Sequence, residues 1–166
     1  DYMDAFATRK AYGHSLVEQF PLHPSLVVLD AEVSNSTFAD TFKKAHPNRF
    51  FEMFIAEQAM VSVALGFASR GALPCVSTFA AFFSRAFDQL RMAALSGKHI
   101  VCAGSHAGIA IGEDGASQMG LEDIALFRSL FGSTVLYPSD HVSEEKLAAL
   151  ALQKKEGVVY IRTTRG

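Results

Sequence analysis

The hydrophobic and polar positions along this chain alternate between short apolar runs and longer stretches with helical spacing. Short uninterrupted apolar runs are typical of strands buried on both faces of a parallel sheet, and they occur at residues 26–30, 50–54, 74–78, 99–103, 134–137 and 158–163. Between them, helical patterns cover about residues 5–19, 36–44, 56–69, 79–95, 121–131 and 143–154. Strands that alternate with helices predict an α/β fold, with a doubly wound, mainly parallel sheet of about six strands and helices on both faces.

The most informative segment is the glycine-rich loop at residues 104–118, which follows one of the predicted strands. It carries a histidine, two acidic residues and a glutamine, and its glycines allow the backbone to approach a ligand closely. Polar residues also follow the other predicted strands. In a parallel sheet these loops meet at the carboxyl edge, where open α/β folds bind ligands. The sequence therefore predicts a site for a small polar molecule at that edge.

Composition narrows the possible functions. The 166 residues fit one domain, and the formal net charge of −2 argues against a nucleic-acid or anionic-membrane partner. No apolar run approaches the roughly 20 residues that cross a bilayer, and we expect no secretory signal. The hydrophobic content of 49% is expected to reflect doubly covered strands together with an interface to another chain. Cys75 and Cys102 lie in strand-like runs, which predicts buried free thiols in a reducing cytoplasm.

Glu57 is the first candidate for chemistry. It precedes a strongly apolar helical segment at residues 59–65, and this position fits two interpretations. An acid in the first turn stabilises a helix through the helix dipole, by roughly a few tenths of a kcal/mol. A carboxylate held among apolar side chains is instead suited to proton transfer. The residues alone leave both interpretations open.

Aromatic and basic side chains supply the remaining candidates. Phe79, Phe82, Phe83 and Phe87 have the spacing of a helical core stripe, but the first two, next to a predicted strand end, also suit a platform for a flat heteroaromatic ring. The sequence has no metal-ligand cluster, Walker-type loop, nucleophile elbow or dinucleotide fingerprint. Three further candidates, each of which fits a loop histidine or a solvated surface charge equally well, are His106, Arg9 and Arg165.

Six segments of the chain, taken in order, resemble the pyrimidine-binding (middle) domain of transketolase, in particular that of the animal-like branch. They are residues 7–13, 35–38, 55–58, 77–82, 104–118 and 161–165. The resemblance implies the pyrimidine module of the thiamine diphosphate-binding fold, with residues 1–166 forming a single pyrimidine-binding domain. In the family a diphosphate-binding domain precedes this domain and a third domain follows it, so we expect the chain to be an excised or processed middle domain. Gly166 stands where the family usually has proline.

The resemblance also implies the chemistry. Transketolase transfers a two-carbon ketol unit from a ketose phosphate to an aldose phosphate, in the pentose phosphate pathway. It uses thiamine diphosphate and a divalent metal such as Mg²⁺, and the metal is held by the diphosphate-binding domain rather than by this chain. Glu57 matches the glutamate that hydrogen-bonds N1′ of the cofactor's pyrimidine and favours the imino form that activates the thiazolium. Phe79, Phe82 and Gln118 match residues of the cofactor pocket, with Phe82 as the stacking ring.

The same resemblance assigns the substrate side of the site and the partners. Arg9, Ser36, His106 and Arg165 match the clamp for the substrate phosphate, where cations and a hydroxyl suit a dianion. Asp114 matches the acid that bonds a substrate hydroxyl. In this family the two ends of the cofactor are bound by different subunits. The resemblance therefore implies a homodimer in which the partner's diphosphate-binding domain completes the site, and an isolated chain that is inactive.

Two alternatives remain open at this point. The chain could belong to a transketolase-like protein that keeps the fold and serves as a non-catalytic assembly or regulatory module. It could also be the matching domain of another thiamine diphosphate enzyme, such as a deoxyxylulose-phosphate synthase or a 2-oxo acid dehydrogenase subunit. The clamp residues, Arg9 with Ser36 and His106 with Arg165, favour phosphorylated sugars and argue against the dehydrogenase.

Overall fold

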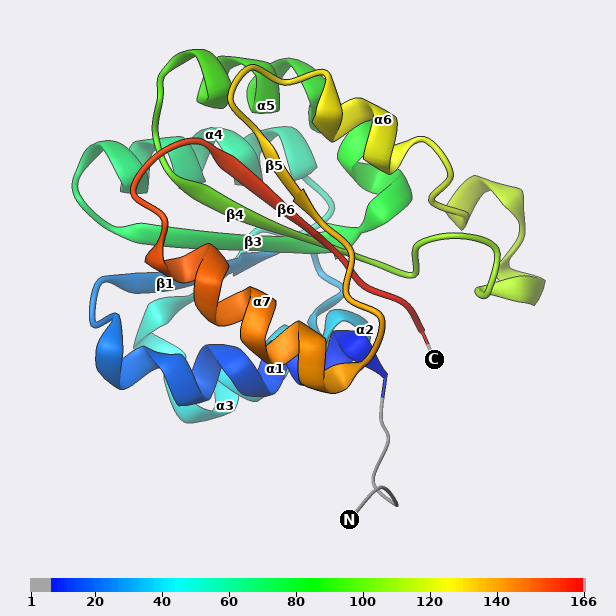
Figure 1. Cartoon of the computed structure of the whole chain (residues 1–166), viewed down its shortest axis with the longest axis horizontal. Helices are drawn as coiled ribbons and strands as arrows, with labels where there is room; N and C mark the ends of the chain where they lie inside the picture. Colours follow the sequence, from blue (N-terminus) through cyan, green and yellow to red (C-terminus); the bar gives the residue numbers. More distant parts are fainter. Residues whose placement is uncertain (1–6, 166) are drawn as a thin grey trace.

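The computed structural model describes residues 7–165, and in this range the strands form one parallel sheet (Figure 1). The strand order is β2-β1-β3-β4-β6-β5, and each neighbouring pair is parallel. The predicted doubly wound α/β fold is confirmed. The strands are β1 (Leu26–Asp30), β2 (Phe50–Glu52), β3 (Leu73–Phe79), β4 (Ile100–Ser105), β5 (Thr134–Leu136) and β6 (Val158–Arg162).

Helices cover both faces of the sheet (Figure 1). On one face α1 packs against α3 and α7, and on the other face lie α4, α5 and α6. Successive side chains of a strand point to opposite faces, so Val28 and Cys75 join the core under α1 and α7, whereas Leu29 and Val76 join the core under α4 and α5. The α-helices are α1 (Thr8–Gln19), α2 (Ser34–Thr37), α3 (Ala39–Ala45), α4 (Glu57–Ser69), α5 (Phe87–Leu95), α6 (Asp123–Arg128) and α7 (His141–Gln153), and the 3-10 helices are η1 (Phe20–Leu22), η2 (Pro47–Arg49), η3 (Ala80–Ala86), η4 (Gly112–Asp114) and η5 (Ala116–Gln118).

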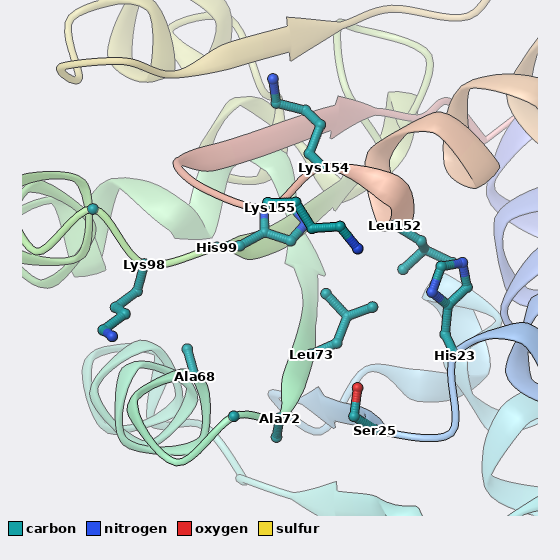
Figure 2. A pocket seen from close by; sticks show the side chains of 12 residues that line it. His23, Ser25, Ala68, Ala72, Leu73, Lys98, His99, Leu152, Lys154 and Lys155 are labelled. Atoms are coloured by element: carbon teal, nitrogen blue, oxygen red, sulfur yellow. The ribbon is translucent and has the colours of Figure 1, made fainter.

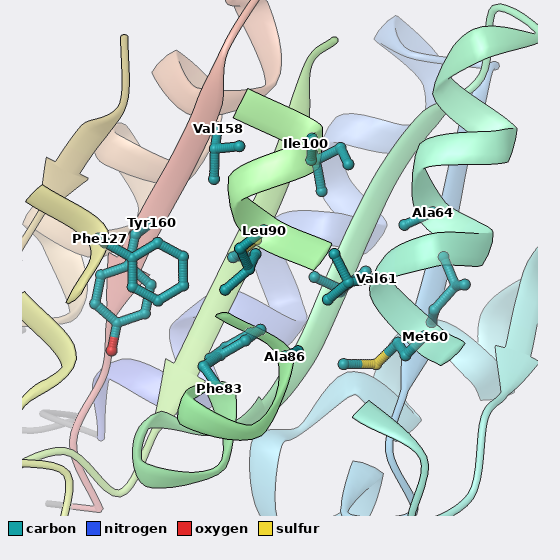
Figure 3. Packing of buried hydrophobic residues seen from close by; sticks show 14 of the residues in the cluster. Met60, Val61, Ala64, Phe83, Ala86, Leu90, Ile100, Phe127, Val158 and Tyr160 are labelled. Atoms are coloured by element: carbon teal, nitrogen blue, oxygen red, sulfur yellow. The ribbon is translucent and has the colours of Figure 1, made fainter. Parts of the chain in front are cut away.

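An aromatic cluster ties the segment after β3 to the sheet (Figure 3). The rings of Phe127 and Tyr160 stack with centroids 3.9 Å apart, and Phe83 meets Phe127 edge-on at 5.3 Å. All three side chains are fully buried. Because Phe83 belongs to η3, its burial fixes η3 beside the carboxyl end of β3, from which the candidate site is built.

Two predicted helices differ from the structure. The helix predicted over residues 36–44 is divided into α2 and α3 at Phe38, whose φ of 63° lies in the left-handed region. The long helix predicted from Phe79 to Leu95 begins as the 3-10 helix η3, and α5 starts only at Phe87. In η3 the hydroxyl of Ser84 donates to the carbonyl oxygen of Ala81 at 2.7 Å, a local bond that competes with α-helical pairing.

The chain leaves β1 and β3 in opposite directions. β1 connects to its outer neighbour β2, whereas β3 connects to β4 on the other side. In open α/β sheets such a switch point opens a crevice at the carboxyl ends of the two strands, and ligands bind there. The residues that follow β1, β3 and β4 therefore lie where a site is expected.

Candidate active site

Glu57 is a buried carboxylate that an arginine holds. It is the first residue of α4 and only 4% exposed. Arg85 Nη1 donates to Glu57 Oε1 at 2.7 Å, whereas Oε2 has no hydrogen-bond partner within residues 7–165. Glu57 is therefore no solvated first-turn acid, although its place at the start of α4 still suits the helix dipole. An open hollow of about 640 Å³ borders this ion pair and is lined by Ile55, Ala56, Glu57, Gln58, Ala59 and Arg85.

Three aromatic rings connect the Glu57 region to the glycine-rich loop. Phe79, the last residue of β3, stacks on Phe82 of η3 with centroids 5.2 Å apart and planes 10° apart. Phe79 also stacks on the ring of His106, with centroids 4.1 Å apart. The guanidinium carbon of Arg85 lies 4.3 Å from the centroid of Phe82. Phe79 and Phe82 are stacked on each other, while Phe83 belongs to the core, and the proposed role of the stacked pair at a ligand ring stays a prediction.

Arg9, Ser36 and Arg165 meet at the other end of this row. Arg9 Nη1 donates to the carbonyl oxygen of Ser36 at 2.7 Å, and Arg9 Nε donates to that of Arg165 at 3.3 Å. Arg165 Nη1 donates to the carbonyl oxygen of Ile111 at 3.1 Å, inside the glycine-rich loop. Burial and the charge of Arg165 lower the pKa of Arg9. Two guanidinium groups in one partly buried cluster repel each other, and an anion bound between them would relieve that repulsion.

His106 lies beside this cationic cluster in a left-handed backbone conformation, with a φ of 56°. Its side chain is buried, and Nδ1 is 3.0 Å from the hydroxyl of Ser105. Burial, followed by the charges of Arg9 and Arg165, lowers the pKa of His106 to about 4, and only Asp114 acts in the opposite direction. The imidazole is therefore neutral near pH 7 and is available for hydrogen bonding.

Asp114 and Gln118 lie in the same loop but make fewer contacts. Asp114 ends η4 and is exposed, and its charge acts on His106. Gln118 ends η5, which lies next to η3. Within the part of the chain that the structure describes, neither side chain hydrogen-bonds another predicted site residue. Their assigned roles at the substrate and the cofactor stay predictions.

Arg85 lies beside Glu57, although the sequence analysis did not single it out. In a 3-10 helix three residues complete a turn, so residues three apart lie on the same side. Phe82 and Arg85 are separated by three positions in η3 and face the same region. The available sequence signal was therefore an arginine three residues after the stacking ring.

Asp30 is a second residue absent from the predicted site. It ends β1 and is fully buried. Its carboxylate accepts hydrogen bonds from the Ser77 hydroxyl at 2.5 Å, the Thr37 hydroxyl at 2.7 Å and the Val33 amide at 2.7 Å. Burial raises the pKa of Asp30 to about 6, although these hydrogen bonds act against the shift. Asp30 thereby ties α2, which carries Ser36, a residue predicted to contact the substrate phosphate, to the sheet.

A buried ion pair supports the base of the glycine-rich loop. Arg162 Nε donates to Asp123 Oδ2 at 2.8 Å, and the Tyr160 hydroxyl donates to the same oxygen at 2.5 Å. Arg162 Nη2 also donates to the carbonyl oxygen of Gly120 at 3.1 Å, and the Gly108 amide donates to that oxygen at 2.8 Å. These bonds close the loop between residues 108 and 120 and so fix the segment that carries Asp114 and Gln118.

A second hollow, of about 340 Å³, lies at the opposite, amino edge of the sheet (Figure 2). It is lined by residues at the starts of β3 and β4, among them Leu73 and His99. Lys98, Lys154 and Lys155 follow the ends of α5 and α7, where cations offset the negative end of the helix dipole. The ammonium groups of Lys98 and Lys154 point away from each other (Figure 2). None of the predicted site residues lines this hollow.

Three further properties concern residues 7–165 as a whole. No group of three or more His, Cys, Asp or Glu side chains in this range is placed to hold a metal ion. None of the helices described there is long and apolar enough to cross a membrane. Cys75 and Cys102 are buried free thiols, as predicted.

Comparison with known proteins relates the chain to one family. Residues 4–166 match the family described as "Transketolase, pyrimidine binding domain". The chain is 55% identical to the transketolase of Homo sapiens and 56% identical to transketolase-like protein 2 of Mus musculus, each over 163 residues. Both alignments cover 98% of this chain and 26% of the relative. The chain thus spans about a quarter of the length of these relatives.

Solved structures agree with this assignment. A split gene transketolase, described as an inactive beta4 tetramer, superposes with a TM-score of 0.85 at 40% identity, over 98% of this chain and 52% of that one. The transketolase of Leishmania mexicana gives a TM-score of 0.88 at 28% identity, over 97% of this chain and 25% of that one. Sequence family and fold agree over nearly the whole chain, and the chain belongs to the family of transketolase pyrimidine-binding domains.

Proposed function

We propose that this domain binds the pyrimidine half of thiamine diphosphate within a transketolase. The complete enzyme transfers a two-carbon ketol unit from a ketose phosphate to an aldose phosphate. The observation that carries the proposal is the placement of a buried carboxylate, Glu57, next to the stacked pair Phe79 and Phe82, which lies at the carboxyl end of β3, one of the two strands of the switch point. The 55% identity to the transketolase of Homo sapiens supports the same reading.

The residues present fit a flat ring that contains nitrogen. Glu57 Oε2 has no hydrogen-bond partner in the described range, and Glu57 lines a hollow of about 640 Å³, which has room for a pyrimidine. The Phe82 ring lies beside the same ion pair, with Arg85 over it and Phe79 stacked on it. A carboxyl group can share a proton with a ring nitrogen, and a neighbouring ring fixes the plane of the ligand.

The remainder of the assembly is part of the proposal. We infer a homodimer in which the diphosphate-binding domain of the partner subunit holds the cofactor's diphosphate and a divalent metal such as Mg²⁺. An isolated chain would then lack half of the site and be inactive. We also propose a cytoplasmic location, which the two buried free thiols support.

Each cluster of this chain has a distinct task in the proposed reaction. When bound, thiamine diphosphate supplies the nucleophilic carbon that accepts and releases the two-carbon unit. Glu57 would hold or release a proton at a nitrogen of the bound pyrimidine. Arg9 and Arg165 attract the substrate phosphate with two positive charges. His106 is neutral near pH 7 and can hydrogen-bond the substrate, and Asp114 is proposed to bond a substrate hydroxyl.

The proposal is tested by Glu57→Gln in the complete enzyme. The amide keeps the size of the side chain but cannot take up and release a proton, so we expect turnover to fall by about 10²- to 10⁴-fold. Circular dichroism should show an unchanged fold. The matched control is Glu18→Gln, since Glu18 is exposed on α1, and it should keep wild-type turnover.

The outcome also distinguishes a catalytic role of this domain from a non-catalytic one. Near-normal turnover of Glu57→Gln would contradict the proposal and leave Glu57 with a structural role. A wild-type enzyme that binds the cofactor without turning over sugar phosphates would favour a non-catalytic role.

A further inference from the structure

We propose that Arg85 is a positioning residue for Glu57, and that it binds one carboxylate oxygen so that the other stays directed to the cofactor's pyrimidine. This inference rests on the proposed function. It begins with an asymmetry in the ion pair: Arg85 Nη1 lies 2.7 Å from Glu57 Oε1, while Oε2 has no hydrogen-bond partner in the described residues. A carboxylate held through one oxygen has a fixed orientation and a second oxygen that is free to bond a ligand.

Arg85 is itself held in place by two contacts besides the ion pair. Its guanidinium lies over the ring of Phe82, with the central carbon 4.3 Å from the ring centroid. Its backbone carbonyl oxygen accepts a hydrogen bond from Gln58 Nε2 at 3.1 Å. The helix η3 that carries Arg85 is fixed to the core by the buried ring of Phe83. The arginine is thus restrained even though its side chain is 50% exposed.

The same arrangement links the two groups that would contact the ring. Arg85 bonds Glu57 and stacks on Phe82, so it sets the position of the carboxylate relative to the aromatic surface. A guanidinium can stack and donate in its own plane at the same time, which an ammonium group cannot do equally well. Arg85 therefore orients the carboxylate through one oxygen and leaves the second oxygen for the ring nitrogen.

The test is Arg85→Met in the full-length enzyme that contains this domain. Methionine keeps an apolar side chain over Phe82 and removes the charge and the donor. We expect thiamine diphosphate, titrated with Mg²⁺ present and followed by calorimetry, to bind about 10- to 100-fold more weakly, the range for loss of a hydrogen bond to a charged group. We also expect kcat to fall, with the KM values for the sugar phosphates unchanged.

Two further variants make the result specific. Arg85→Lys restores a positive charge near Glu57 without the stacked plane, so it should recover part of the lost affinity. Arg91→Met is the matched control, because Arg91 lies on the neighbouring helix α5, is 56% exposed and, among residues 7–165, forms an ion pair only with Asp88, at 3.5 Å. This control should bind the cofactor as the wild type does.

Each other outcome would overturn the inference. Equal cofactor affinity and kcat in Arg85→Met would mean that Glu57 needs no positioning by Arg85. Tighter binding would mean that Arg85 occupies the place of the pyrimidine and competes with it. Failure of the proposed function is recognised separately, because the wild-type enzyme would then bind no cofactor, or Glu57→Gln would keep its turnover.

Discussion

At the scale of single residues, Glu144 couples the stability of this domain to pH. It lies in the first turn of α7 and is fully buried, and neither of its carboxyl oxygens has a hydrogen-bond partner in the described structure. Burial raises the pKa of Glu144 to about 8. Tyr12 of α1 is close enough for the two groups to interact electrostatically. A carboxyl group in this environment is protonated at neutral pH.

The sign of the pH dependence follows from the direction of this shift. Between about pH 4.5 and pH 8 the folded chain keeps the Glu144 proton and the unfolded chain has lost it. Its contribution to the free energy of unfolding is therefore fully present at low pH and is lost as pH rises towards 8, by at most about 1.4 kcal/mol per pH unit. Glu144→Gln should remove this slope, as measured by urea unfolding across that range. Glu145 is partly exposed, so Glu145→Gln is the control and should keep the slope of the wild type. Equal slopes of unfolding free energy against pH in the two variants would contradict the assignment to Glu144.

The sequence could single out a site residue only where that residue lies in a local motif. Glu57, Phe79 and Phe82 were singled out because they lie in segments that resemble motifs of the family, and their roles at the cofactor stay predictions. Asp30 was not identifiable, because its role arises from hydrogen bonds to Ser77, which is 47 residues away in the sequence. Long-range bonds of this kind leave no local pattern to detect.

At the scale of elements, the strands were easier to predict than the helices that carry the site. β1 was predicted with its observed bounds, Leu26–Asp30, because residues buried on both faces form an uninterrupted apolar run. The segment after Phe79 was misassigned as α-helix, because its periodicity could not distinguish 3-10 from α geometry over residues 80–86. Arg85 escaped prediction for a different reason, because its contact with Glu57 spans 28 positions in the sequence and leaves no local pattern.

The approach of α1 to the corner between α2 and α3 gives a prediction about a single element. A Cβ atom at Gly13 of α1 would lie well inside van der Waals contact of the Phe38 carbonyl oxygen. Since backbone atoms cannot yield cheaply there, we expect Gly13→Ala to lower the free energy of unfolding by about 1–3 kcal/mol. The same variant should weaken the contact between Arg9 and Ser36, which lie on either side of this corner.

Gly66 of α4 provides the matched control for this substitution. A Cβ atom there meets nothing within 4 Å, and alanine is the better helix former, so Gly66→Ala should raise the free energy of unfolding by about 0.5–1 kcal/mol. Urea denaturation at low chain concentration measures both variants. If Gly13→Ala is as stable as the wild type, the close packing of α1 is not a constraint on the fold.

At the scale of the whole molecule, one face of the sheet is covered by helices that still expose apolar side chains. On α4 and α5 these include Val63 at 40%, Met92 at 47% and Leu95 at 59% exposure. A shallow hollow beside Val63 is lined by Gly66, Phe67 and Arg70 as well. Exposed apolar surface of this kind marks contact with another chain when it extends beyond a few hundred Å². The whole-chain hydrophobic content of 49% is consistent with such a face.

We therefore predict that the isolated chain self-associates as a dimer through the helices that follow Glu57 and Phe79. Sedimentation at roughly 100 µM, a concentration at which weak interfaces persist, should show a mass above that of the monomer. Val63→Lys places a charge on this face and should shift the chain towards the monomer. Leu150→Lys is the control, because Leu150 is 56% exposed on α7 at the opposite face, and it should leave the association unchanged. A wild-type chain that sediments as a clean monomer would contradict self-association. A loss of association with Leu150→Lys alone would place the interface on the face of α7 instead.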